Sequence, residues 1–417
     1  MTKVVFHLGD KKTGSTAIQS ALGSKGWTCT TVRLDYPVNE RINHIAIAKS
    51  LQPRSANDAL VANRMGVIVR DIQKSKPDVA VISAEDFEDV DPEVLKAAVQ
   101  KYMPDYAEDA RYIAYVRPHA DRLVSSYAER LKTGGVLESM DDLLKRFDAT
   151  GLLAYVPRFE KWRSTFSAAF ALRPMVRDLL YRRDVVADFL RFALGTEDFV
   201  VTDGPDSNES LSLENLAIVR RLHVALTHGG EKKSAPFQPA VGRALARRMN
   251  ATAFAKGTKV RIHRELAEKV AKICAEDAAQ LDAAFFTGTP MTDALKAAPG
   301  LAVDVAQSIR IEDHFSEREQ YLINLMVDQT VALLELDPEQ TAWLLREEHR
   351  AKMIAPDEID LPKQRKRAKG AHKGLGGPGG KAGRPKAGGG PKAGGGKVGG
   401  VKGVGPKRRL RPAKAPE

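Results

Sequence analysis

Short apolar runs alternate with helix-like segments over the first 130 residues of the chain. The runs cover residues 4–8, 79–83 and 112–116, and each is followed by a turn and then by apolar residues at helical spacing. Continuous apolar runs are typical of buried parallel strands. Residues 30–34 predict a weaker fourth strand and residues 199–201 a fifth. The alternation predicts an α/β fold with a parallel sheet flanked by helices, in which ligands bind beyond the carboxyl ends of the strands.

The pattern changes twice further along the chain. Segments such as "LENLAIVRRLHVAL" and "REQYLINLMVDQTVALLEL" have long helical periodicity, with no convincing strand among them. After them, Gly, Lys, Pro and Ala fill nearly every position, and no aromatic residue occurs beyond Trp343. We therefore expect an α/β core at residues 1–210, a helical subdomain completing it at 211–350, and a linker with a disordered basic tail at 351–417.

The charge of the chain is unevenly distributed. The 417 residues carry a formal net charge of +12, but residues 362–417 alone contain 17 Lys or Arg and one acidic residue. The remainder is thus mildly acidic, at −4. Only the tail is polybasic, and through charge alone it is suited to contact nucleic acid or other polyanions.

The cysteine content and the N-terminus indicate a cytoplasmic protein. The two cysteines, Cys29 and Cys274, are far apart and have no metal-ligand spacing, so neither a disulfide framework nor a zinc site is expected. The first residues lack the pattern of a secretory signal, and no apolar run approaches the roughly 20 residues of a membrane helix.

The stretch "VVFHLGDKKTGSTAIQSAL" at residues 4–22 places a strand, a glycine-bounded loop and a helix N-terminus in series. The first N–H groups of a helix lack internal partners, and the helix dipole adds partial positive charge there. Lys12, Ser15 and Thr16 contribute an ammonium and two hydroxyl groups. The stretch therefore predicts a site for a phosphate-like oxyanion.

The loop differs from the P-loop of nucleotide hydrolases, because Ser15 stands where that pattern requires lysine. Its lysine instead precedes the second glycine, in "KTGST". This resembles the 5′-phosphosulfate loop of sulfotransferases that use 3′-phosphoadenosine 5′-phosphosulfate (PAPS), in their bacterial and carbohydrate-type branch. The resemblance implies that Lys12, Thr13, Gly14, Ser15 and Thr16 bind the 5′-phosphosulfate.

A second motif, "YIAYVRPHADRLVSSYAERL", carries the same resemblance at residues 112–131. It resembles the family's 3′-phosphate motif, which implies that Arg117 at a strand end and Ser125 in the following helix bind that phosphate. Pro118 suits the start of the helix. Arg122 is a second candidate cation, and the alternative is a surface arginine paired with Asp121 or Asp142.

Sulfuryl transfer resembles phosphoryl transfer, so catalysis rests on positioning and electrostatics. We expect Lys12 to neutralise the leaving phosphate, without a metal. Glu85, in "VAVISAEDF", is the candidate general base, although Glu85 or Asp86 could instead cap the next helix. His44 is the alternative base, and His7 is interpreted as a packed core residue.

The predicted function is sulfuryl transfer from PAPS to a hydroxyl acceptor, which the carbohydrate-type resemblance makes a candidate carbohydrate. A P-loop kinase or nucleotide hydrolase is a second interpretation, and a non-catalytic protein that binds nucleic acid through its basic tail is a third. The sequence does not identify the acceptor, because residues 211–350 offer no decisive aromatic platform or charge cluster.

Overall fold

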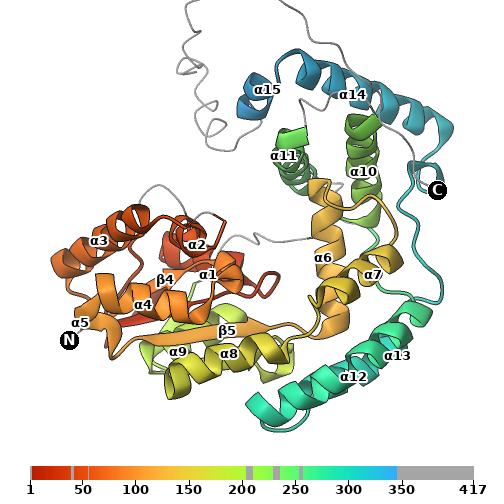
Figure 1. The fold of residues 1–417 in the computed structure, drawn as a ribbon. Coiled ribbons are helices and arrows are strands. Elements are labelled where there is room, and N and C mark those ends of the chain that lie inside the picture. The colour runs from red at the N-terminus through yellow and green to blue at the C-terminus, as the bar shows by residue number, and fades with distance from the viewer. Residues whose placement is uncertain are drawn as a thin grey trace, which may run out of the picture. The chain divides into compact units, whose positions relative to one another are not determined.

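A five-stranded parallel sheet forms the centre of the first 200 residues (Figure 1). Its strand order is β3–β4–β1–β5–β6, and every neighbouring pair is parallel. The strands are β1 (Lys3–His7), β3 (Leu34–Asp35), β4 (Val79–Ser83), β5 (Arg111–Val116) and β6 (Phe170–Pro174). The α/β class with a helix-flanked parallel sheet is thereby confirmed.

The computed structural model describes residues 2–38, 42–54, 56–202, 210–228, 235–252 and 257–344, and the structural statements below concern these residues. The linker and basic tail predicted at 351–417 lie outside the described residues. Among the helices of the described ranges, none has an apolar stretch of the length needed to cross a membrane.

The three strong strand predictions are confirmed, whereas the weaker ones need correction. Residues 199–201 do form a strand, β7 (Phe199–Val201), but it pairs antiparallel with β2 (Trp27–Cys29), outside the main sheet. The strand predicted at residues 30–34 is wrong, because most of that stretch connects β2 to β3. The edge strand β6 was not predicted, since its sequence FALRP contains an arginine and a proline and is only partly buried.

Alternating residues of the strands enter two separate hydrophobic clusters. Val4, Phe6 and Tyr112 face one cluster, and Val5 and Ile113 face the other. The first cluster includes α2 (Ile45–Leu51), α3 (Asp58–Ser75), α4 (Pro92–Tyr102) and α8 (Val156–Phe166). The second includes α1 (Ser15–Ser24) and α9 (Val185–Leu194). Both faces of the sheet are therefore covered, as a parallel sheet requires.

Local sequence sets the helix ends. Asn57 and Asp91 cap α3 and α4 through their side chains, and Pro92 occupies the first turn of α4. Gly134 ends α6 (His119–Thr133) in the left-handed conformation. The remaining short elements are α5 (Pro104–Ala107), η1 (Glu85–Asp89), η2 (Ser167–Ala169), η3 (Arg177–Leu179), η4 (Tyr181–Arg183), η5 (Ala235–Phe237) and η7 (Ile311–Asp313).

Helix α6 connects the sheet to the helices that follow (Figure 1). It packs against α7 (Met140–Thr150), α10 (Leu213–His228), α11 (Gln238–Asn250), α12 (Arg264–Phe285) and α13 (Pro290–Leu301). Beyond them lie α14 (Glu317–Leu336) and α15 (Pro338–Leu344). At the start of α6, His119 Nε2 lies 2.9 Å from Asp277 Oδ2, and Asp277 Oδ1 accepts the N–H of Val156. This carboxylate thereby links α12 to both α6 and α8.

The contact between α6 and α11 depends on one glycine. A Cβ atom at Gly242 would lie 1.8 Å from the carbonyl oxygen of Lys132, an oxygen that also lies 3.0 Å from Nε2 of His223. No side chain fits at that distance. The two helices can pack this closely only because residue 242 has no side chain.

Gly242→Ala should lower the free energy of unfolding by about 2 kcal/mol or more, because α11 must move away from α6. The matched control is Gly66→Ala in α3, where the new Cβ meets nothing closer than 3.6 Å. It should be neutral or stabilise by up to about 1 kcal/mol, since alanine favours a helix more than glycine does. Urea unfolding measures both variants, and equal stabilities would contradict this packing argument.

Candidate functional site

The three central strands end at the same edge of the sheet. Since β4, β1 and β5 are parallel neighbours, the loop after β1, Glu85 after β4 and Arg117 after β5 follow one another along this edge. Gly9 allows the close approach, because it has φ +88° and a Cβ there would lie 2.8 Å from Cα of Glu85. The sequence-predicted residues of these three segments are therefore brought together.

The loop between β1 and α1 exposes unused backbone donors. Lys12 and Gly14 both have positive φ, at 70° and 82°, on either side of Thr13. The N–H groups of residues 12–16 donate no hydrogen bond to any described residue. Successive free N–H groups in such a turn, at the start of a helix, form a concave site for an anion. Gly14 itself is fixed by packing, since a Cβ there would lie 2.9 Å from Val185 Cγ1.

The loop hydroxyls divide into two kinds. Thr13 Oγ1 and Ser15 Oγ both donate to the carbonyl oxygen of Asp10, at 2.5 and 3.4 Å, and both residues are buried. Thr16 is exposed, and its hydroxyl forms no hydrogen bond with a described residue. In this state Thr13 and Ser15 brace the loop, whereas Thr16 and the backbone amides are available to a ligand.

Lys12, within the loop, forms an ion pair with Glu129 of helix α6. Its Nζ is 3.0 Å from Glu129 Oε2, and Lys132 pairs with the same carboxylate. Burial lowers the pKa of Lys12, and the Glu129 carboxylate opposes that change. The ammonium group is thus partly desolvated, which strengthens its attraction for an anion.

Arg117 reaches the same loop from the end of β5. Its Nη1 donates to the carbonyl oxygen of Lys12 at 2.9 Å. It forms no ion pair with any described residue. Burial lowers the pKa of its guanidinium group, and the Asp121 carboxylate opposes that change. A largely buried arginine that no carboxylate contacts directly is stabilised when an anion completes its surroundings. The Arg117 side chain therefore contacts the backbone of the loop that contains Lys12.

Ser125 lies about two turns into α6, as its position in the motif predicts. It shares a helix face with Glu129, four residues further on, and its hydroxyl forms no hydrogen bond with a described residue. The structure thus places Ser125 on the loop-facing side of α6. Its contact with a phosphate stays a prediction.

Arg122 is not a surface arginine paired with Asp121 or Asp142, so that interpretation is wrong. Its side chain is 3% exposed, and its guanidinium lies 3.2 Å from Asp10 Oδ2 and 2.9 Å from Glu88 Oε1. It also donates to the carbonyl oxygen of Lys11. Arg158 of α8 binds the same two acids, at 2.8 Å from Asp10 Oδ2 and 2.6 Å from Glu88 Oε1.

These four side chains, Asp10, Glu88, Arg122 and Arg158, form a buried charge cluster beneath the loop. Burial raises the pKa of Asp10 to about 7, against the opposing effect of Arg158. Burial acts in the same direction on Glu88, but Arg122 and Arg158 outweigh it and hold the pKa of Glu88 well below its usual range. The Glu88 carboxylate also accepts the N–H of Lys11 at 3.0 Å. The cluster therefore fixes the backbone of the loop that follows β1.

Glu85 begins η1, at the edge of the sheet. Burial raises its pKa, and the nearby Lys12 ammonium opposes the rise. Neither Glu85 nor Asp86 caps the following helix, because the side chain of Asp91 caps α4. The alternative in which they serve only as that cap is therefore wrong, and the pKa of Glu85 changes in the direction that a general base needs.

His44 and His7 have structural surroundings. His44 Nδ1 accepts the N–H of Ser83 at 3.1 Å, and Nε2 lies 2.9 Å from the carbonyl oxygen of Pro37. Burial lowers the pKa of His44 to about 4. His7 is fully buried, and its Nδ1 lies 2.8 Å from the Ser83 hydroxyl. His7 is thus packed in the core, and both ring nitrogens of His44 are engaged by the backbone.

Sequence reasoning missed Asp10, Glu88, Glu129 and Arg158. Glu129 could have been found, because it lies seven residues after Arg122 and hence on the same face of the predicted helix. Asp10 could also have been found, because an acidic residue within the proposed anion loop needs a cationic partner. Nothing local to Glu88 or Arg158 distinguishes them from surface residues.

A scan against protein-family models and a search of curated proteins each found no match to this chain. Within the described ranges, no group of three or more His, Cys, Asp or Glu side chains is arranged to hold a metal ion.

Arg158→Gln should lower the free energy of unfolding by about 3 kcal/mol, because it leaves two buried carboxylates with one guanidinium. The matched control on the same helix is Lys161→Gln, whose exposed ammonium pairs with Asp91. Lys161→Gln should lower the free energy of unfolding by about 1 kcal/mol or less, because surface ion pairs contribute little to stability. Chemical denaturation compares the two, and equal losses would show that the cluster contributes no more than a surface pair.

Proposed function

We propose that the protein is a sulfotransferase that moves a sulfuryl group from PAPS to a hydroxyl acceptor. One observation carries the proposal: Arg117, which has no ion-pair partner among the described residues, donates to the carbonyl oxygen of Lys12 in the anion loop. The guanidinium group that follows β5 thereby contacts the backbone of the loop that follows β1. A nucleotide with two separate phosphates matches that arrangement.

The loop is suited to the 5′-phosphosulfate group. The free N–H groups of residues 12–16 and the exposed Thr16 hydroxyl are donors for its oxygens, while Lys12 supplies the charge. Arg117 and Ser125 are the proposed ligands of the 3′-phosphate. This division of the residues follows the resemblance of the two motifs, and the geometry supports it by bringing both motifs to the same place.

Catalysis in this proposal rests on Lys12 and Glu85. As the bond between sulfur and the bridging oxygen lengthens, negative charge develops on the leaving phosphate, and the Lys12 ammonium stabilises it. The Glu85 carboxylate takes the proton of the acceptor hydroxyl. Glu129, which pairs with Lys12, positions the ammonium group over the loop.

Glu85 is preferred to His44 as the base. Burial raises the pKa of Glu85, which strengthens it as a base, while burial lowers the pKa of His44 to about 4 and weakens it. In addition, His44 would have to break a backbone hydrogen bond before it could accept a proton on Nδ1. The proposed acceptor is a hydroxyl compound, with carbohydrates as the first class to screen.

The purified protein should bind 3′-phosphoadenosine 5′-phosphate, the product of the donor, in a calorimetric titration. Lys12→Ala and Arg117→Ala should each weaken binding by about tenfold or more, as expected for the loss of a charge-assisted contact. Arg111→Gln is the control for the arginine, because Arg111 lies at the opposite end of β5.

Lys11→Ala is the control for the lysine, since the Lys11 ammonium pairs with Asp89 and, at 3.9 Å, with Glu88, and not with the α6 carboxylate. It should cost much less affinity than Lys12→Ala. Unchanged affinity in both Lys12→Ala and Arg117→Ala would contradict the site. Tight binding and hydrolysis of ATP with magnesium, without binding of the bisphosphate, would favour a nucleotide hydrolase instead.

Sulfuryl transfer, once an acceptor is identified, should increase as the pH rises through the pKa of Glu85, because only the carboxylate form accepts a proton. Burial places that midpoint above the ordinary value of 4.5. Glu85→Gln should abolish this acid limb and lower kcat by about 100-fold or more, while affinity for 3′-phosphoadenosine 5′-phosphate stays nearly unchanged. An intact pH profile in Glu85→Gln would assign the proton transfer to another group.

A further inference from the structure

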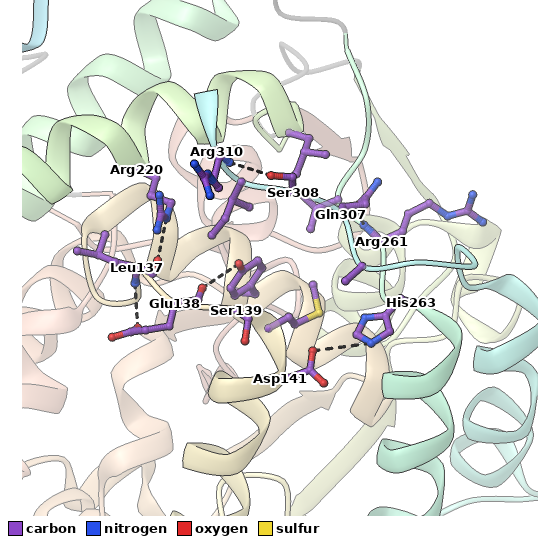
Figure 2. Close-up of a pocket in the computed structure, with 16 residues that line it drawn as sticks. Leu137, Glu138, Ser139, Asp141, Arg220, Arg261, His263, Gln307, Ser308 and Arg310 are labelled. Carbon is purple, nitrogen blue, oxygen red and sulfur yellow. Dashed lines mark hydrogen bonds and ion pairs between the residues drawn. The ribbon is translucent and has the colours of Figure 1, made fainter. Parts of the chain in front are cut away.

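Two adjoining cavities lie among the helices that follow the sheet. The first, of about 250 Å³, forms where the connection from α6 to α7, helix α10 and the extended segments 260–263 and 306–310 meet (Figure 2). The second, of about 330 Å³, is lined by one face of α10 and by residues 310–312. Arg220 and Arg310 line both cavities. Together the cavities reach the size at which proteins bind small organic ligands.

These cavities are separate from the anion loop. None of their lining residues belongs to the loop, to η1 or to the end of β5. On α6, Tyr127 lines the first cavity, while Glu129 pairs with Lys12. Residues two apart point about 200° from each other around a helix, so the cavity and the loop lie on opposite sides of α6.

The second cavity carries an excess of positive charge. Its seven lining residues include Arg220, Arg221 and Arg310, against a single acidic residue, Glu312. Glu312 is already paired, because Arg310 Nε lies 3.3 Å from its Oε2. Arg220 Nε donates to the carbonyl oxygen of Leu137, and Arg221 Nε donates to Asn324 Oδ1.

Arg220 and Arg221 therefore have only uncharged acceptors. Neither forms an ion pair with any residue in the described ranges, and both are half-buried. The terminal nitrogens of each guanidinium group are therefore available to another partner. Both side chains line the second cavity, so an anion there is attracted by both guanidinium groups.

The acidic residues of the first cavity do not neutralise these arginines. Glu138 binds Arg146 at 2.7 Å. Asp141 lies 3.8 Å from His263 Nε2 (Figure 2) and 3.8 Å from Lys269 Nζ. Each carboxylate thus has a cation of its own. The apolar part of that wall is formed by Leu137, Met140, Leu213, Val260 and Ile309.

We propose that the two cavities bind a small phosphate or sulfate ester, whose oxyanion contacts Arg220, Arg221 and Arg310 in the second cavity. The uncharged part of the ligand lies in the first cavity, against its apolar wall. The size of that cavity suits a group comparable to one sugar ring. This site is independent of the proposed nucleotide site and does not rest on sulfuryl transfer.

Calorimetric titration of the full chain with glucose 6-phosphate, glucose 6-sulfate and glucose tests the proposal. We expect at least one of the two esters to bind. The ester that binds more tightly tells whether the site takes a phosphate or a sulfate. Glucose should bind at least tenfold more weakly than that ester. The double variant Arg220→Gln/Arg221→Gln should weaken ester binding by tenfold or more. Arg70→Gln, an exposed arginine of α3, is the matched control and should leave binding unchanged.

Arg310→Gln is a second test, and it should not disturb folding because Arg310 is exposed. This variant should also weaken ester binding. Arg117→Ala should leave their affinity unchanged. The proposal is overturned if neither ester binds more tightly than glucose, or if folded Arg220→Gln/Arg221→Gln and Arg310→Gln proteins bind like the parent. Loss of ester binding in Arg117→Ala alone would assign these ligands to the anion loop instead.

Discussion

The buried charge cluster of Asp10, Glu88, Arg122 and Arg158 is the interaction on which the candidate site depends. Its members come from four parts of the chain: the loop after β1, η1, α6 and α8. Separating any of them would leave a charge in a dry environment, which is far more costly than losing a surface pair. The cluster therefore holds the loop in one position relative to the ends of β4 and β5.

Helix α6 extends this constraint to the second half of the chain. It begins directly after Arg117 and Pro118, contributes Arg122 to the cluster, and pairs Glu129 with Lys12. Its other side packs against the helices from α10 onward. One helix thus fixes both the cationic groups at the sheet edge and the wall of the separate cavities behind it.

The sequence predicts those parts of the fold that depend on local pattern. The strands β1, β4 and β5 are buried on both faces, so their apolar runs stand out in the sequence. The helix starts at Ser15 and His119 can also be predicted, because Gly14 and Pro118 precede them. The strand β6 is half-buried at an edge and carries no such run. A pairing such as β2 with β7 joins residues 170 positions apart, and no local signal reports it.

The same distinction applies to the site. Lys12, Glu85 and Arg117 follow strands, and the rule that parallel strands end together brings them to one edge. Glu88 and Arg158 of the buried charge cluster could not be assigned, because a charged residue at a helix surface looks alike in sequence whether it faces solvent or a buried ion of opposite sign. The tertiary packing of α6 and α8 decides between the two.

The free donors of residues 12–16 belong to the main chain, and this has a consequence for how the loop tolerates change. Replacing a side chain leaves the peptide N–H groups in place, so these donors persist when the side chains of the loop change. The two glycines cannot vary, because their backbone angles and close neighbours exclude a side chain. The backbone donors of the loop therefore depend on those glycines more than on the side chains between them.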